Sequence, residues 1–180
     1  MKNNTSENDK IHHRCHCTGQ EFTFDEWIDY LKINSSDKTE HTAGKYKFNI
    51  HDACMNPDVE LKYNDKYNIC SYRITVCQSD NLNWTYGYYY HFHNIYGCGG
   101  AKYAIDDKYN KSYKSKREAV LACLDFLLKK AARELKDEER GFMDNNGKIR
   151  KSTYCPHIKL AIKHIKTQIA MQQYIQLSLF

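Results

Sequence analysis

Two stretches in the middle of the chain alternate between hydrophobic and polar side chains. Residues 69–77 place an apolar group at every second position, and residues 84–92 do the same with five aromatic side chains on one face: Trp84, Tyr86, Tyr88, Tyr90 and Phe92. A period of two predicts β-strands with one buried face. Residues 79–83 are rich in Ser, Asp and Asn, which favour turns. The two strands are therefore predicted to pair antiparallel.

Weaker patterns flank this pair of strands. Residues 46–50 alternate in the same way and predict a short edge strand, preceded by a polar loop over residues 34–44. Residues 51–68 give mixed signals. The glycines within residues 97–100 predict a turn, and a further strand is expected to begin at Ala101.

Two capping boxes predict the starts of helices. In such a box a Ser or Thr and a Glu three residues later satisfy each other's backbone N–H groups. Thr23 with Glu26 predicts a helix over residues 24–33, and Ser115 with Glu118 predicts one that ends near residue 139. The second helix has an apolar stripe that should cover the aromatic side of the sheet, formed by Val120, Leu124, Leu127, Ala131 and Leu135.

A last helix is predicted over residues 156–174, after a break at residues 141–147. Pro156 suits a first helical turn, and isoleucines at positions 158, 162, 165 and 169 form one stripe. The fold class is therefore α+β: an antiparallel sheet of three to four strands with helices packed on one face, plus a C-terminal helix and short tail. We expect a flexible N-terminal arm (1–20), an α+β domain (21–140), a basic helical segment (141–175) and a tail (176–180).

The positive charge is concentrated at one end of the chain. The net charge is +5, and residues 141–180 contain six Lys or Arg against the single acid Asp144, whereas the preceding residues are balanced. Such asymmetry favours a polyanionic partner, and DNA is the one expected, although a solvated helix face would look the same. The candidate nucleic-acid-binding residues are Arg73, Tyr89, His91, His93, Lys114, Lys116, Arg117, Lys148, Arg150, Lys151, Lys159, Lys163 and Lys166.

Cysteine and histidine offer two candidate metal sites. The eight cysteines are dispersed and, without a secretory leader, should stay reduced, but Cys15 and Cys17 lie among His12, His13 and His16 and could hold zinc. His91 and His93 are expected to point the same way from one strand. A carboxylate from Asp52, Asp58 or Glu60 would complete a metal site. No catalytic residue is assigned.

The chain contains no apolar run long enough to cross a bilayer, and its first ten residues are polar. We therefore expect a cytoplasmic protein without a membrane partner.

The last five residues are Gln176, Leu177, Ser178, Leu179 and Phe180. This run resembles the pentapeptide by which bacterial replication and repair proteins dock on the beta sliding clamp, the ring that encircles DNA behind the polymerase. The resemblance implies that the two leucines and the phenylalanine fill the clamp's hydrophobic pocket while the glutamine bonds at its rim. A last helical turn packed on the protein's own core is the alternative.

A second resemblance concerns the body of the chain. The order helix, three strands, helix is similar to that of double-stranded-RNA-binding domains, and residues 115–119 resemble the basic start of their second helix. The aromatic strand and the glycines near position 100 depart from that pattern. The resemblance implies a phosphate-binding helix start, which backbone amides and the helix dipole would favour.

Together these features predict a bacterial, phage or mobile-element accessory protein that docks on the sliding clamp, either recruited by the clamp or inhibiting it, and contacts DNA. The alternatives are a small metal-dependent DNA-processing enzyme that uses the clamp as a platform, and a nucleic-acid-binding module without clamp contact.

Overall fold

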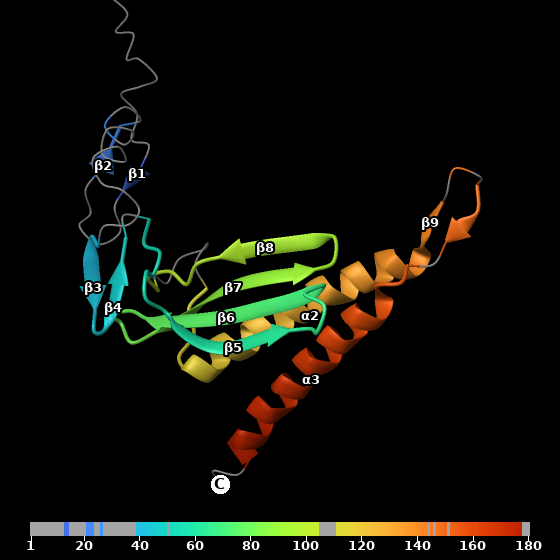
Figure 1. Ribbon diagram of the computed structural model, residues 1–180. Coiled ribbons are helices and arrows are strands. Elements are labelled where there is room, and N and C mark those ends of the chain that lie inside the picture. The colour runs from blue at the N-terminus through green and yellow to red at the C-terminus, as the bar shows by residue number, and fades with distance from the viewer. Residues whose placement is uncertain are drawn as a thin grey trace, which may run out of the picture.

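The computed structural model describes residues 13–14, 21–23, 26, 39–49, 51–104, 111–143, 145, 147–150 and 152–177. Its centre is a four-stranded antiparallel sheet in the order β5 (Asp58–Asn64), β6 (Cys70–Gln78), β7 (Trp84–Phe92) and β8 (Ile95–Gly99). The long helices α2 (Lys116–Arg140) and α3 (Cys155–Leu177) both lie against one side of this sheet (Figure 1). The predicted α+β class is confirmed.

The aromatic strand packs as its alternation predicts. Tyr88 and Tyr90 of β7 lie beside Phe126 of α2, with ring centroids 4.7 and 6.1 Å apart. Strand β6 contributes Tyr72 and Ile74 to the same core, which is therefore enclosed between the sheet and the helices. The strands β6 and β7 begin and end within a residue of their predicted positions.

Helix α2 begins at the predicted capping box. The Ser115 side chain accepts a hydrogen bond from the Glu118 backbone N–H at 3.2 Å, and the Glu118 carboxylate accepts from the Ser115 N–H at 3.3 Å. The predicted stripe on α2 faces the core. Helix α3 adds Ile158 and Ile165, both fully buried, to that core, so α3 is held against both α2 and the sheet.

The prediction of a turn at residues 97–100 is wrong, because Gly97 and Gly99 lie within β8. They pair with Tyr90 and Tyr88 across the ladder. A Cβ built on either glycine would come within 2.8 Å of the partner tyrosine ring. The rings thus lie over the glycines, and glycine appears here because an aromatic neighbour needs its space.

The region before β5 also differs from the prediction. The predicted loop at 34–44 includes β3 (His41–Ala43), which forms a hairpin with β4 (Tyr46–Phe48) around a turn where Gly44 has φ +56°. Residues 51–68, for which no element was predicted, contain β5. A small second core, formed by Ala43, Tyr46, Phe48, Cys54, Cys77 and Ala101, joins the hairpin to one end of the sheet.

Four very short strands complete the described elements. Strands β1 (His13–Arg14) and β2 (Glu21–Phe22) pair, as do β9 (Phe142–Met143), inside the expected break at 141–147, and β10 (Ile149–Arg150), just after it. The capping box of Thr23 and Glu26 is present, with the Thr23 N–H donating to the Glu26 carboxylate at 2.8 Å. The rest of the helix predicted over residues 24–33 lies outside the described residues. Neither α2 nor α3 is both long and apolar enough to cross a membrane.

Candidate nucleic-acid interface

One face of the central sheet is not covered by α2 or α3 (Figure 1). Cross-strand partners in an antiparallel sheet share a face, so the ladder places two rows of side chains there. We call these eight residues the open sheet face. The first row, from β5 to β8, is Lys62, Arg73, Tyr89 and Cys98, and the second is Asn64, Ser71, His91 and Tyr96.

The open sheet face is cationic and aromatic. Tyr89 is 42 % exposed and Tyr96 81 % exposed, which is unusual for rings of this size in a sheet. Lys62 and Arg73 are exposed, and neither is paired with an acidic residue in the described ranges. None of the eight positions is Asp or Glu. A shallow hollow of about 440 Å³ lies among Lys62, Arg73 and Tyr89.

The other end of the same face is covered by the chain itself. Thr85 and Gly87 are buried there, because the segment 100–104 passes over them. The Thr85 hydroxyl donates to the Lys102 carbonyl oxygen at 2.5 Å. The half that carries the two rows is therefore the more accessible part of the two central strands.

Of the four sheet residues predicted for this surface, Arg73, Tyr89 and His91 lie on it together, but His93 does not. His93 occupies the turn after β7 with φ +54°. Its ring stacks on Tyr154 at 3.8 Å between centroids, and its Nε2 lies 3.7 Å from Glu138. The expectation that His91 and His93 point the same way from one strand is wrong.

The sequence offers two candidate metal sites, and the structure describes the side chains of only one of them. Within the described ranges, no three His, Cys, Asp or Glu side chains are grouped as metal ligands would be. Asp52 is buried, whereas Asp58 and Glu60 bind lysines. The side chains of the N-terminal cluster, including Cys15 and Cys17, lie outside the described residues.

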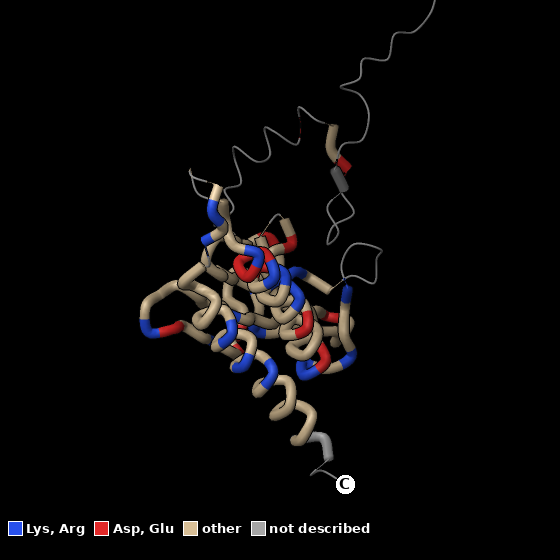
Figure 2. The backbone as a smooth tube through the Cα atoms, turned by 90° about the vertical axis from the view of Figure 1, so that its right-hand side faces the viewer, with Lys and Arg blue, Asp and Glu red and all other residues tan. Residues whose placement is uncertain are grey.

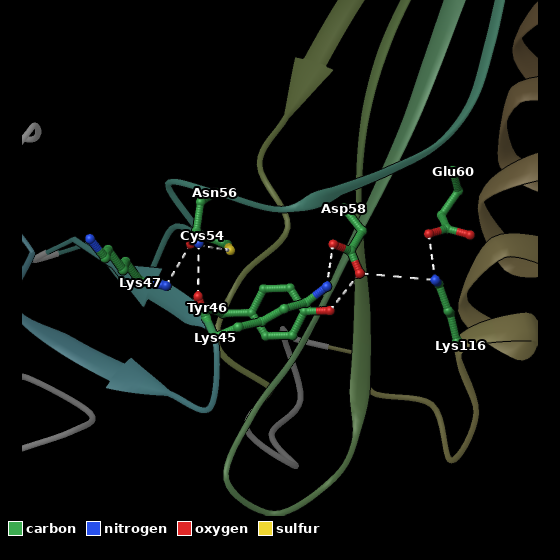
Figure 3. A network of polar contacts seen from close by, with 8 residues as sticks. All are labelled: Lys45, Tyr46, Lys47, Cys54, Asn56, Asp58, Glu60 and Lys116. Atoms are coloured by element: carbon green, nitrogen blue, oxygen red, sulfur yellow. Dashed lines mark hydrogen bonds and ion pairs between the residues drawn. The ribbon is translucent and has the colours of Figure 1, made fainter.

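A network of paired charges joins the hairpin, β5 and the start of α2 (Figure 3). The Asp58 carboxylate accepts from Lys45 Nζ at 2.6 Å and from the Tyr46 hydroxyl at 2.8 Å, and Lys116 Nζ lies 2.6 Å from Glu60. The hydrogen bond from Lys45 lowers the pKa of Asp58. The pKa of Tyr46 is raised, mainly by burial and secondly by its hydrogen bond to the Asp58 carboxylate. Two lysines and two carboxylates balance, so this network holds elements together.

The start of α2, expected to bind phosphate, is occupied by contacts within the protein. Lys116 binds Glu60, Lys114 Nζ donates to the Asn83 side-chain oxygen at 3.1 Å, and Arg117 Nε donates to the Gln172 carbonyl oxygen at 2.6 Å. The last of these contacts fixes α3 against α2. Lys148 and Arg150 lie in the exposed hairpin of β9 and β10, and Lys151 lies outside the described residues.

Helix α3 carries a second cationic surface, which we call the lysine face. Lys159, Lys163 and Lys166 follow the spacing that puts them on one side of a helix. Figure 2 shows basic positions recurring along the first half of α3, followed by turns without charge, and α3 contains no acidic residue. The three lysines border a shallow groove of about 510 Å³. Only Lys159 has an acidic partner among the described residues, namely Glu139 at 2.8 Å, which raises the pKa of Lys159.

The predicted clamp-binding pentapeptide begins inside α3. Gln176 and Leu177 belong to the last turn of the helix, and Ser178, Leu179 and Phe180 lie outside the described residues. The end of α3 extends past the sheet and α2 (Figure 1). Met171 is 54 % exposed and Tyr174 70 % exposed, so these two side chains, just before the pentapeptide, are not packed on the core.

Four residues of the open sheet face, Lys62 and Asn64 on β5 and Tyr96 and Cys98 on β8, were missed from sequence because their strands were missed. Leu61 and Tyr63 alternate with Lys62 and Asn64, which is a usable signal for β5. The position of Tyr96 has no comparable local signal, because its strand is only five residues long and two of them are glycine. Comparison of this chain with protein-family models, with curated proteins and with solved structures finds no match.

Proposed function

We propose that this protein is an accessory factor of DNA replication or repair that docks on the beta sliding clamp through Gln176–Phe180 and contacts the enclosed DNA through the lysine face of α3. The observation that carries the proposal is that the helix bearing the lysine face runs into the first two residues of the pentapeptide, Gln176 and Leu177. The lysine face and the pentapeptide follow each other along α3, on a stretch that contains no acidic side chain.

The helix sets how near the start of the pentapeptide lies to the lysine face. At 1.5 Å per residue, the ten residues from Lys166 to Gln176 span about 15 Å along the axis. Ile158 and Ile165 are buried in the core, so the lysine-bearing part of α3 moves with the body of the protein. A ligand that seats the tail would therefore bring the lysines to a defined position beside whatever the ring encloses.

The energetics of the tail call for a second contact. Burying two leucines and one phenylalanine contributes roughly 5 to 9 kcal/mol, from which the costs of association and of ordering the tail are subtracted. Such a peptide binds weakly alone. A cationic surface on the same rigid element raises the effective concentration at the ring when DNA passes through it.

Docking requires the end of α3 to unwind. Successive helical residues are rotated by about 100°, so in a continued helix Leu177 and Leu179 would point in nearly opposite directions. An extended backbone brings these two leucines to one side. Helix ends fray at little cost, and Met171 and Tyr174, in the turn before the pentapeptide, are exposed.

The test is binding of the full-length protein to purified clamp, with wild type compared with the double variant Leu179→Ala/Phe180→Ala. A matched control, Met171→Ala/Tyr174→Ala, removes exposed apolar groups from α3 just before the pentapeptide. We expect wild type and the control to bind and the tail variant to lose binding. Equal binding by all three proteins, or by none, would contradict the proposal.

Clamp docking would serve recruitment or inhibition, because the tail occupies the same pocket in both cases. Expression in a bacterial host separates the two roles. Growth arrest that requires the last five residues would identify an inhibitor, whereas unaffected growth with retained clamp binding would identify a recruited factor.

A further inference from the structure

We propose that the open sheet face binds single-stranded nucleic acid, on the side of the sheet opposite to α3. The inference deepens the nucleic-acid part of the proposed function by naming a second surface and its substrate class. It depends on the sheet alone and does not require that the tail docks on a clamp.

The aromatic groups on this face suit unpaired bases. Tyr96 lies opposite His91, two residues along β7 from Tyr89, so Tyr89 and Tyr96 are diagonal neighbours roughly 7–8 Å apart. Both rings are exposed, at 42 % and 81 %. Each could stack one base, and stacking of this kind accepts any base because every base has a π-face. Bases inside a duplex are stacked on each other and are not available for such contacts.

The cationic groups are placed to hold the backbone of the same strand. Lys62 and Arg73 are cross-strand partners, and Arg73 is also the partner of Tyr89. With neighbouring strands about 4.8 Å apart, the two charges lie one and two strands away from the tyrosine ring. Neither cation is paired with a described acidic residue, so a phosphate would not have to displace a partner.

The charge pattern selects this partner over a protein surface. The carboxylates of β5, Asp58 and Glu60, are bound by Lys45 and Lys116 at the sheet edge, and the eight residues of the open sheet face contain no acid. The face therefore presents a positive charge beside exposed rings. Exposed rings interleaved with unpaired cations complement a polyanion that carries flat apolar groups, which describes a single strand.

The test uses the full-length protein and fluorescent oligo-dT and oligo-U, without clamp. Tyr89→Thr/Tyr96→Thr removes both rings and keeps β-branched residues that suit strands. We expect a loss of affinity of about 5- to 150-fold for each ring removed. Tyr89→Phe/Tyr96→Phe keeps the rings and should bind like wild type. A preference for oligo-U over oligo-dT, or the reverse, identifies RNA or DNA as the physiological strand.

Two further variants test the charges. Lys62→Gln/Arg73→Gln should reduce the dependence of log K on log salt by about 1.4, because each contact to a single strand contributes roughly 0.7. The control Arg133→Gln removes an exposed arginine of α2 on the other side of the sheet and should change nothing. Thermal unfolding of each variant verifies that the fold is retained.

Cysteine alkylation locates the bound strand independently of affinity. Cys98 is exposed beside Tyr89 on the open sheet face, and Cys155 is partly exposed at the start of α3. An oligonucleotide on the open sheet face should slow the reaction of Cys98 with iodoacetamide and leave Cys155 unchanged. Three results would overturn the sheet site: protection of Cys155 alone, affinity that survives loss of both rings, or no binding. Protection of Cys155 alone would leave the role of α3 intact.

Discussion

Removing charge from the lysine face should weaken duplex DNA binding by an amount that depends on salt. Lys163→Gln/Lys166→Gln keeps good helix formers at both positions, and neither lysine has an acidic partner among the described residues. Each phosphate contact to duplex DNA contributes about 0.9 to the slope of log K against log salt. Loss of two contacts should therefore reduce the slope by about 1.8. Between 50 and 200 mM salt, wild-type binding should then fall roughly tenfold more than that of the variant.

Lys159 supplies the matched test with the opposite sign. Its partner Glu139 lies 2.8 Å away, and both side chains are about half exposed, at 58 % and 51 %. An exposed ion pair of this kind contributes little to stability, so Glu139→Gln should leave the protein folded while releasing Lys159 for a phosphate. We expect tighter duplex binding and a slope increased by up to about 0.9.

Fluorescence anisotropy of a labelled duplex, measured at several salt concentrations, gives the affinities and the slopes. The reasoning is refuted if Lys163→Gln/Lys166→Gln leaves the slope unchanged, or if Glu139→Gln weakens binding. Either result would mean that α3 does not face the phosphates.

Three further predictions concern the scaffold. Ser115→Ala should lower the free energy of unfolding by about 1 kcal/mol, and the melting temperature by about 2–4 °C, through loss of the helix cap; thermal unfolding followed by circular dichroism measures it. Gly87→Ala should lower the free energy of unfolding by about 1–3 kcal/mol, because the new Cβ would collide with the backbone of Ala101. Gly100→Ala should be tolerated, because its Cβ would make only an ordinary contact, and urea titration of both variants measures the difference. Burial lowers the pKa of His164 below 6.5, so the unfolded chain takes up a proton there before the folded one as the pH falls, and stability should drop below about pH 6.5. In urea titrations at pH 7.5 and 5.5, His164→Gln should lose less stability than wild type, and an equal loss would contradict this origin.

The elements predicted well from sequence are those whose pattern is local. Strands β6 and β7 alternate over nine residues each, and α2 has both a capping box and a continuous apolar stripe. The same cannot be said of β5. Its ladder shifts register between Val59 and Leu61, so the alternation is interrupted in the middle of the strand.

Strand β8 and His93 were misread for a different reason. Glycine favours turns in isolation, and only the tyrosines across the ladder explain Gly97 and Gly99 within a strand. His93 continues the alternation of β7, yet the chain turns there with a positive φ that histidine tolerates better than most residues. Both features depend on pairing with distant residues, which a local pattern does not contain.

The candidate surfaces likewise include features that a local pattern predicts and features that depend on distant residues. Alternation in β6 and β7 was enough to place Arg73, Tyr89 and His91 on one face, and helical spacing was enough to group the lysines of α3. Which cations are already paired could not be read from sequence. Lys116 and Arg117 have binding partners 56 and 55 residues away in the chain, so only the fold shows that they are occupied.

The central claim is that one helix carries both the clamp-docking tail and a DNA-contacting surface. Its most direct test is the affinity of the full-length protein for clamp assembled on duplex DNA, compared with free clamp. We predict that wild type binds the DNA-bound ring more tightly, that Lys163→Gln/Lys166→Gln loses this gain but still binds the free ring, and that Leu179→Ala/Phe180→Ala loses binding to the free ring. Equal affinity of wild type for both forms of the ring would contradict the claim.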